Sequence, residues 1–308
     1  MAKKKKNKIN TQTRIIGVLI IINILFLFYF IKTEKLLSFN FINDIVESKT
    51  REAIFERINP SSGYEINAKY GNLGPKMLKI GVIDFDKFNA IYEEATPLTD
   101  DQIKLLKEGS NKKIKITKEN SHFLLNFFWA VGLTNKTKIL DEGDMVKYSE
   151  GEAGNFASTG GWSLGKSDAM AYYSNNTLIP LTEEQEKLVL EVSSNVYRPC
   201  CGNPTSFPDC NHGMALLGVL ELMASQGATE REMYEAAKYI NAFWFPSTYY
   251  DLARYFEVKE KKNFSNIDAK VILSKDYSSA QGYMDTKKWM SENGLVEEVQ
   301  EGGGSCGV

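Results

Sequence analysis

The sequence predicts a mainly α-helical protein with an N-terminal single-pass membrane anchor and a cysteine- and histidine-rich loop between two later helices. An apolar run spans residues 15–31. Three later segments begin with a threonine that is followed three positions on by Gln or Glu, which is the capping pattern of helix N-termini. Three of the four cysteines and one of the two histidines lie between residues 200 and 212. Together these features indicate an anchored helical protein with one chemically distinctive loop.

The predicted anchor is apolar throughout except for Asn23. At about 1.5 Å per residue it would be roughly 25 Å long, which is the short end of what crosses a bilayer core. Residues 1–14 contain six Lys or Arg and no acidic residue, whereas Lys32, Glu34 and Lys35 follow the apolar run. This asymmetry predicts a cytoplasmic N-terminus and an extracytoplasmic bulk. A cleavable signal peptide has a similar pattern, but the absence of a small-x-small cleavage site favours an uncleaved signal anchor.

Charge and composition restrict the classes of partner. The whole chain carries a formal charge of −2, so residues 15–308 carry −8 once the six positive charges of residues 1–14 are set aside. A mildly acidic exterior without a basic cluster argues against nucleic acid as a partner. The expected partners are the membrane, through residues 15–31, and an extracytoplasmic protein.

The chain is predicted to have seven consecutive parts. They are a basic cytoplasmic head (1–14), the anchor (15–31), a juxtamembrane helix and linker (32–75), an upstream helical subdomain (76–150), a Gly/Ser-rich connector (151–179), a Cys/His helical subdomain (180–258), and a loose C-terminal region (259–308) that ends in a glycine-rich tail with Cys306. Pro and Gly clusters supply the predicted boundaries near residue 75.

Helix starts are the most specific local signals. Thr99, Thr182 and Thr229 each satisfy the capping-box pattern, with Gln102, Gln185 and Glu232 at the third helical position. The expected helices from residue 182 onward end near residues 197, 227 and 245, and shorter helices follow at 249–256 and 285–292. An earlier segment that starts at Thr117 is apolar on too many sides for a surface helix, so a buried central helix is expected there. His122, near its start, is interpreted as a structural histidine.

Residues 160–167, GGWSLGKS, match the phosphate-binding pattern G-x-x-x-x-G-K-[ST]. That loop functions between a buried β-strand and a helix. The preceding residues, EGEAGNFAST, are not a buried strand, so no nucleotide is expected. We instead expect a glycine-rich loop that packs Trp162 against its surroundings.

The Cys/His loop holds the candidate chemistry. Cys200, Cys201, Cys210, His212 and the distant Cys306 form a ligand set that suits zinc or copper(I). Met214 could join a copper site, although a methionine in such an apolar helix is more often part of the core. Thiol–disulfide exchange through Cys200, Cys201 and Cys210 is an alternative. A disulfide-stapled structural or interaction domain is another, because disulfides persist outside the cytoplasm. No Ser-His-Asp set is detectable, so whether the protein is an enzyme stays open.

Residues 197–245 contain Arg198, Cys201, Asn203, Asn211, the run Glu221-Leu222-Met223, Gly227 and Glu232-Met233 in sequence. In this order they resemble the thiol-bearing helical segment of the CcmH family of cytochrome c maturation proteins. The resemblance implies thiol exchange with an apocytochrome. The family has two residues between its cysteines, whereas Cys200 and Cys201 are adjacent in this chain.

Overall fold

A computed structural model describes residues 29, 32, 49–93 and 96–295. The chain divides into two compact units, residues 1–53 and 54–308. Of the first unit, residues 29, 32 and 49–53 are described, and all are helical. The predicted anchor lies outside the described residues except for Tyr29, and so does Cys306. Within the described part of the chain, no helix is both long enough and apolar enough to cross a membrane.

The second unit is mainly helical and also contains a two-stranded sheet that the sequence analysis missed. Strand β1 (Tyr64–Gly71) pairs antiparallel with β2 (Ser110–Ile116), with Tyr64 opposite Ile116 and Ile66 opposite Ile114. Their inward side chains are buried because alternate residues of a strand point to the same face. Residues 64–71 therefore form a strand where a linker was predicted, and the predicted upstream helical subdomain contains the second strand.

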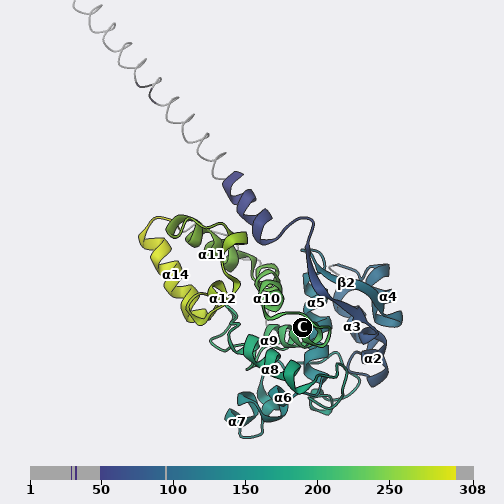
Figure 1. Ribbon diagram of the computed structural model, residues 1–308. Coiled ribbons are helices and arrows are strands. Elements are labelled where there is room, and N and C mark those ends of the chain that lie inside the picture. The colour runs from purple at the N-terminus through teal and green to yellow at the C-terminus, as the bar shows by residue number, and fades with distance from the viewer. Residues whose placement is uncertain (1–28, 30–31, 33–48, 94–95, 296–308) are drawn as a thin grey trace, which may run out of the picture. The chain divides into compact units, whose positions relative to one another are not determined.

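Three helices lie between these two strands in the chain (Figure 1). They are α2 (Leu73–Ile80), α3 (Phe85–Glu93) and α4 (Asp100–Glu108). The capping box predicted at Thr99 is confirmed, since its hydroxyl accepts from the Gln102 amide and the Gln102 side chain accepts from the Thr99 amide. Residues 54–58 are helical as well, and Ile54 and Ile58 are buried.

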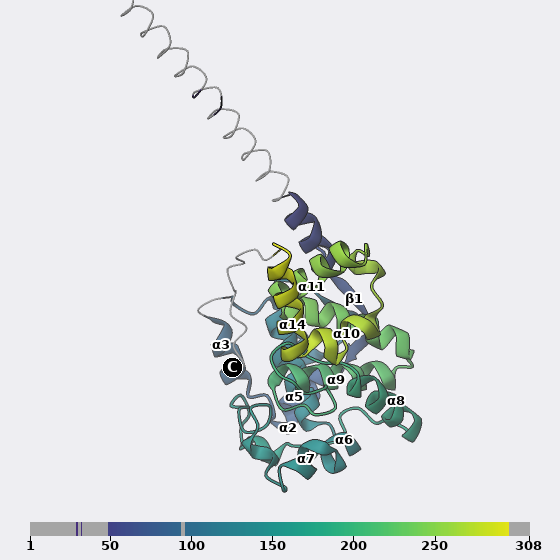
Figure 2. The same ribbon diagram turned by 90° about the vertical axis from the view of Figure 1, so that its left-hand side faces the viewer.

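Helices α5 (Ser121–Thr134) and α9 (Asn211–Ser225) form the centre of this unit, as Figures 1 and 2 show. The predicted central helix is confirmed, with nearly every residue of α5 buried. Gly132 lies against Gly218, and three residues further along both helices Asn135 donates to Glu221 at 2.9 Å. The two helices therefore run parallel. Their backbones come into direct contact because neither glycine has a Cβ.

The connector predicted at 151–179 is an irregular segment with two short 3-10 helices, η1 (Ala153–Asn155) and η2 (Ala169–Ala171). Two short helices precede it, α6 (Lys138–Glu142) and α7 (Asp144–Tyr148). Trp162 is buried, packs edge-on against Trp129 and donates to the Val82 carbonyl at 2.8 Å. The amide of Lys166 donates to Gly81 O at 2.8 Å, and that of Ser167 donates to the Tyr172 hydroxyl at 2.8 Å. These amides, which would face phosphate in a nucleotide loop, hold the segment against its neighbours.

The remaining helices are α8 (Glu183–Ser194), α10 (Glu230–Trp244), α11 (Pro246–Lys259), α12 (Ala269–Ile272), α13 (Lys275–Ser278) and α14 (Ala280–Glu292), with the 3-10 turn η3 (Phe264–Asn266) before α12. Of these helices, α8 and α10 contact α9, and the others pack against α10 or against one another. The capping boxes at Thr182 and Thr229 are confirmed. The region beyond residue 259 is more ordered than predicted: Phe264, Ile272 and Leu273 are fully buried, and α14 begins five residues before the predicted helix at 285–292.

Glu221 gives a pH-dependent prediction. It is fully buried, one carboxylate oxygen has no hydrogen-bond partner in the described structure, and burial raises the pKa of its carboxyl well above the usual value. The folded state therefore retains a proton that the unfolded state releases, so its contribution to stability declines as pH rises above about 4.5. We expect Glu221→Gln to flatten this decline in urea unfolding between pH 5 and 8, and an unchanged slope would show that Glu221 is ionised in the fold.

Candidate metal centre

Cys200 and Cys201 lie in the loop between α8 and α9, and Cys210 lies at its end. Hydrogen bonds hold the backbone of this loop in place. Tyr197 and Pro204 form an isolated antiparallel bridge, and the Thr205 amide donates to Val196 O at 2.8 Å. The amide of Tyr197 donates to Leu273 O, and that of Ala280 donates to Cys201 O, each at 2.9 Å. The loop is therefore joined to the C-terminal end of α12 and to the start of α14. A loop fixed from both sides can hold side chains in one arrangement.

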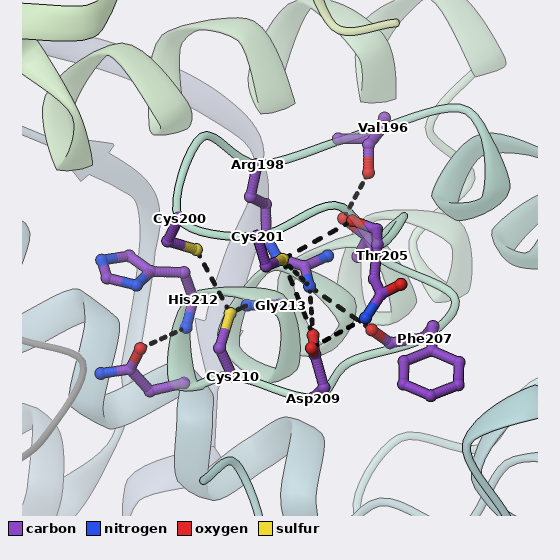
Figure 3. A network of polar contacts seen from close by, with 12 residues as sticks. Val196, Arg198, Cys200, Cys201, Thr205, Phe207, Asp209, Cys210, His212 and Gly213 are labelled. Atoms are coloured by element: carbon purple, nitrogen blue, oxygen red, sulfur yellow. Dashed lines mark hydrogen bonds and ion pairs between the residues drawn. The ribbon is translucent and has the colours of Figure 1, made fainter. Parts of the chain in front are cut away.

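Three thiols meet in this loop (Figure 3). The Sγ atoms of Cys200, Cys201 and Cys210 all lie within 4.8 Å of one another, and Cys200 Sγ is 3.5 Å from Cys210 Sγ. Cys210 is buried, whereas Cys200 and Cys201 are half-buried. A tetrahedral zinc ion with Zn–S bonds of about 2.3 Å separates its sulfurs by about 3.8 Å. The three sulfurs are thus close to the spacing of ligands around one metal ion.

A fully buried guanidinium lies beside the thiols. Arg198 Nη2 donates to Asp209 Oδ1 at 2.8 Å, to Cys201 Sγ at 3.1 Å and to Phe207 O at 3.4 Å. Asp209 is held in turn by Asn203, whose Nδ2 donates to its Oδ2 at 2.9 Å. The side chain of Arg198 lies directly against Gly213, where a Cβ would come within 2.7 Å of the guanidinium carbon. Because Gly213 has no Cβ, the guanidinium of Arg198 can lie against the first turn of α9.

Cys210 is also the N-cap of α9. Its Sγ accepts a hydrogen bond from the Gly213 amide at 3.4 Å, so the sulfur lies at the positive end of the helix dipole. Hydrogen bonding from Cys200 and Cys201, together with the charge of Arg198, holds the pKa of Cys210 well below its usual value despite burial. This geometry stabilises one thiolate before any metal binds.

The pKa values of the other two thiols are shifted in the opposite direction. Hydrogen bonds to Cys201 and Cys210, then burial, raise the pKa of Cys200 far above its usual value. For Cys201 the hydrogen bond with Cys200 lowers the pKa, but the interaction with Cys210 and burial outweigh it and the pKa is raised to about 11. Burial lowers the pKa of the Arg198 guanidinium, but the opposite charges around it, that of Cys210 first, outweigh burial and the pKa is raised. A metal ion would have to displace the protons of Cys200 and Cys201.

The structure places His212 next to this cluster, on the first turn of α9 (Figure 3). The imidazole is buried against Trp244 and Phe245, with ring centroids 5.6 and 4.5 Å away, and its Nδ1 has no hydrogen-bond partner among the described residues. A buried nitrogen without a partner is uncommon, and a metal ion would provide one. Met214 is fully buried in the hydrophobic core.

His122 lies nearer to His212 than their separation in sequence indicated. Burial and the charge of His212 lower the pKa of His122. Trp244 connects the two segments, since its Nε1 donates to the Ser121 carbonyl at 3.1 Å while its ring packs against His212.

Asp209 was not predicted as a site residue, and Arg198 was predicted only as part of the family resemblance. Their signal was an Arg and an Asp inside a cysteine-rich loop, where Arg198 is fully buried and Asp209 is half-buried. What the sequence did not indicate was that these two side chains would form a 2.8 Å ion pair beside the thiols.

Comparison with known proteins adds no further information about this site. No family model matches the chain, and neither does any curated protein or solved structure. The site is therefore interpreted from its own geometry.

Proposed function

We propose that this protein binds a soft or borderline metal ion, with zinc as the best fit, through Cys200, Cys201 and Cys210. The observation that supports the proposal most is the convergence of the three sulfurs within 4.8 Å. His212 is proposed as a fourth ligand, because its unpartnered Nδ1 lies on the same helix turn as Cys210. Thiolate and imidazole are the usual ligands of structural zinc.

Charge favours zinc over copper(I). Three thiolates and Asp209 would supply four negative charges, and Arg198 supplies one positive charge. Zn²⁺ then leaves a net charge of −1 in the site, whereas Cu⁺ leaves −2. Uncompensated charge is costly in a buried site, so the divalent ion is the better match.

The same contacts suggest what the metal would do. Cys200 and Cys201 belong to a loop joined by hydrogen bonds to Leu273 and Ala280, and Cys210 begins the central helix α9. A metal bound by all three would connect these segments, and its binding free energy would add to the stability of the fold. We propose a mainly structural role for the ion.

Thiol–disulfide exchange is the second candidate, favoured by the 3.5 Å separation of Cys200 and Cys210. A thiolate-stabilising environment at Cys210 next to a half-buried thiol is what such exchange requires. It also agrees with the resemblance to the CcmH family. Cysteine-to-serine variants that trap mixed disulfides with another protein would support this function over metal binding.

We further propose that residues 15–31 anchor the protein in a membrane and that the metal centre lies outside the cytoplasm. The support is the Lys/Arg excess before the apolar run. A reporter fused after Val308 should be active only outside the cytoplasm, and mature protein beginning beyond residue 31 would show instead that the segment is a cleaved signal.

Metal titration of single variants tests the proposal. We expect Cys200→Ser, Cys201→Ser and Cys210→Ser to weaken zinc binding at least about 100-fold, equivalent to about 2.7 kcal/mol. His212→Ala should weaken it at least about tenfold. Ser206→Ala is a matched control in the same loop and should bind like the wild type. Equal zinc affinity in all five proteins would contradict the proposed site.

A further inference from the structure

Cys200 and Cys210 are placed differently from Cys201 within the thiol cluster. The Sγ atoms of Cys200 and Cys210 are 3.5 Å apart, and all three cysteines are free thiols. Cys201 Sγ instead accepts from Arg198 Nη2 at 3.1 Å and donates to Asp209 Oδ1 at 3.7 Å. Figure 3 shows the contacts of Cys201 on the side of the Arg198–Asp209 ion pair, away from the contact between Cys200 and Cys210. The cluster therefore consists of one close pair and a third thiol that has charged partners of its own.

The position of Cys201 favours a disulfide between the other two cysteines. A bond between Cys200 and Cys201 would close a small strained ring, because the two residues are adjacent in the chain. A bond between Cys201 and Cys210 would require Cys201 to leave its charged partners, while its own carbonyl is held by the Ala280 amide at 2.9 Å. Cys200 and Cys210 already contact each other through their sulfurs. Of the three possible pairs, Cys200–Cys210 needs the least rearrangement.

Exposure sets the order in which these two thiols would react. Cys200 is half-buried, whereas Cys210 is 7% exposed and its Sγ accepts a hydrogen bond from the Gly213 amide. A small oxidant therefore reaches Cys200 first. Cys210 lies directly behind Cys200, at the N-cap of α9, where it can attack the oxidised sulfur. The reaction can then be completed within one chain, without a partner protein.

We propose that a hydroperoxide oxidises Cys200 and Cys210 to a reversible disulfide, and that this disulfide expels the metal ion. The Cys200 sulfur attacks the terminal oxygen of the hydroperoxide, the O–O bond breaks, and Cys200 becomes a sulfenic acid while an alcohol leaves. Cys210 then attacks the Cys200 sulfur, the S–S bond forms, and the hydroxyl group leaves as water. Two thiols are oxidised to one disulfide, and one hydroperoxide is reduced to an alcohol and water.

The release of metal rests on the proposed metal binding, whereas the disulfide does not. Zinc binds thiolates, so the disulfide removes two of its three proposed sulfur ligands. Cys201 and His212 remain, which is too few protein ligands for a closed zinc site. The disulfide also joins the loop to the start of α9, the same two segments that the metal would connect. The thiol loop would therefore be cross-linked by metal when reduced and by sulfur when oxidised.

Equimolar hydrogen peroxide, added to reduced full-length protein with and without bound zinc, tests both steps. Mass spectrometry after alkylation should find the Cys200–Cys210 disulfide in both samples, with Cys201 alkylated. A chromogenic chelator should record zinc release equal to the disulfide formed, and a reducing agent should restore zinc binding. In zinc-free samples, Cys201→Ser should form the same disulfide. Cys200→Ser should slow the oxidation of Cys210 at least about tenfold, because it removes the accessible thiol that reacts first.

Mapping of the wild type decides the pairing without any variant, so a variant that fails to fold does not affect the result. Absence of an internal disulfide, or one that contains Cys201 or Cys306 in place of this pair, would overturn the proposal. Disulfides only between chains would overturn it as well. Zinc that stays bound after Cys200 and Cys210 have paired would refute the release step. If the reduced protein binds no zinc, the release step fails together with the proposed metal function, and the zinc-free sample still decides the pairing.

Discussion

Replacing Arg198 by methionine is expected to lower the free energy of unfolding of the metal-free, reduced protein by about 3–5 kcal/mol. Methionine has a similar length but no charge, so Asp209 and the Cys210 thiolate would lose the cation that neutralises them. Removing one member of a buried ion pair costs about this much because the other charge is left uncompensated. Urea unfolding of Arg198→Met and wild type measures the effect. The pH profile of Cys210 alkylation should also shift upward, because Arg198 helps to lower the pKa of that thiol.

Arg57→Met is the matched control. Arg57 pairs with Glu257 at 3.1 Å, but both side chains are about one-third exposed. An ion pair in contact with solvent contributes about 0–1 kcal/mol. If Arg198→Met costs no more than Arg57→Met, the buried guanidinium does not stabilise the thiol loop in the way described above.

Substitution of Gly132 by alanine is the second change with a large expected effect. The added Cβ would lie 2.0 Å from the carbonyl oxygen of Met214, a backbone atom of the facing helix. Helices α5 and α9 would have to separate, and this should cost about 3 kcal/mol or more, at the upper end of overpacking effects. Because α9 also begins at the thiol cluster, the zinc affinity of Gly132→Ala should fall together with stability.

Gly202→Ala provides the comparison, since no atom lies within 4 Å of a Cβ at that position. A surface change of this kind should stay within about 0.5 kcal/mol of wild type. Thermal or urea unfolding of both variants measures the difference, and a mild Gly132→Ala would mean that the two helices are not held in contact by their glycines.

The parts of the fold that could be predicted from the sequence are those that have a local signal. Each capping box depends on residues three positions apart, so Thr99, Thr182 and Thr229 were recognisable without knowledge of the tertiary structure. The buried character of α5 was also readable, because its apolar residues surround the helix.

The strands were missed although they had a signal. Tyr64, Ile66, Ala68 and Tyr70 alternate with polar residues, and this is the period of a half-buried strand. The partner strand has only Ile114 and Ile116 in that pattern among lysines. A pairing between residues about 40 to 50 positions apart depends on tertiary contacts, so the alternation alone did not identify the strand pair.

The candidate site was predicted in its residues but not in its arrangement. The clustering of cysteines near residue 200 indicated soft-ligand chemistry, and the structure brings three of the predicted residues together with His212 beside them. The pair between Arg198 and Asp209 depends on the path of the loop between α8 and α9, and the proximity of His122 to His212 depends on how α5 packs against α9. Contacts of that kind leave no fixed spacing in a sequence.

Elemental analysis of anaerobically purified full-length protein, with free-thiol counting on the same sample, tests the metal centre most directly. We expect about one zinc per chain, and we expect the thiols of Cys200, Cys201 and Cys210 to react with an alkylating reagent only after a chelator has removed the metal. Protein that contains no stoichiometric metal and has these cysteines oxidised to disulfides would contradict this expectation.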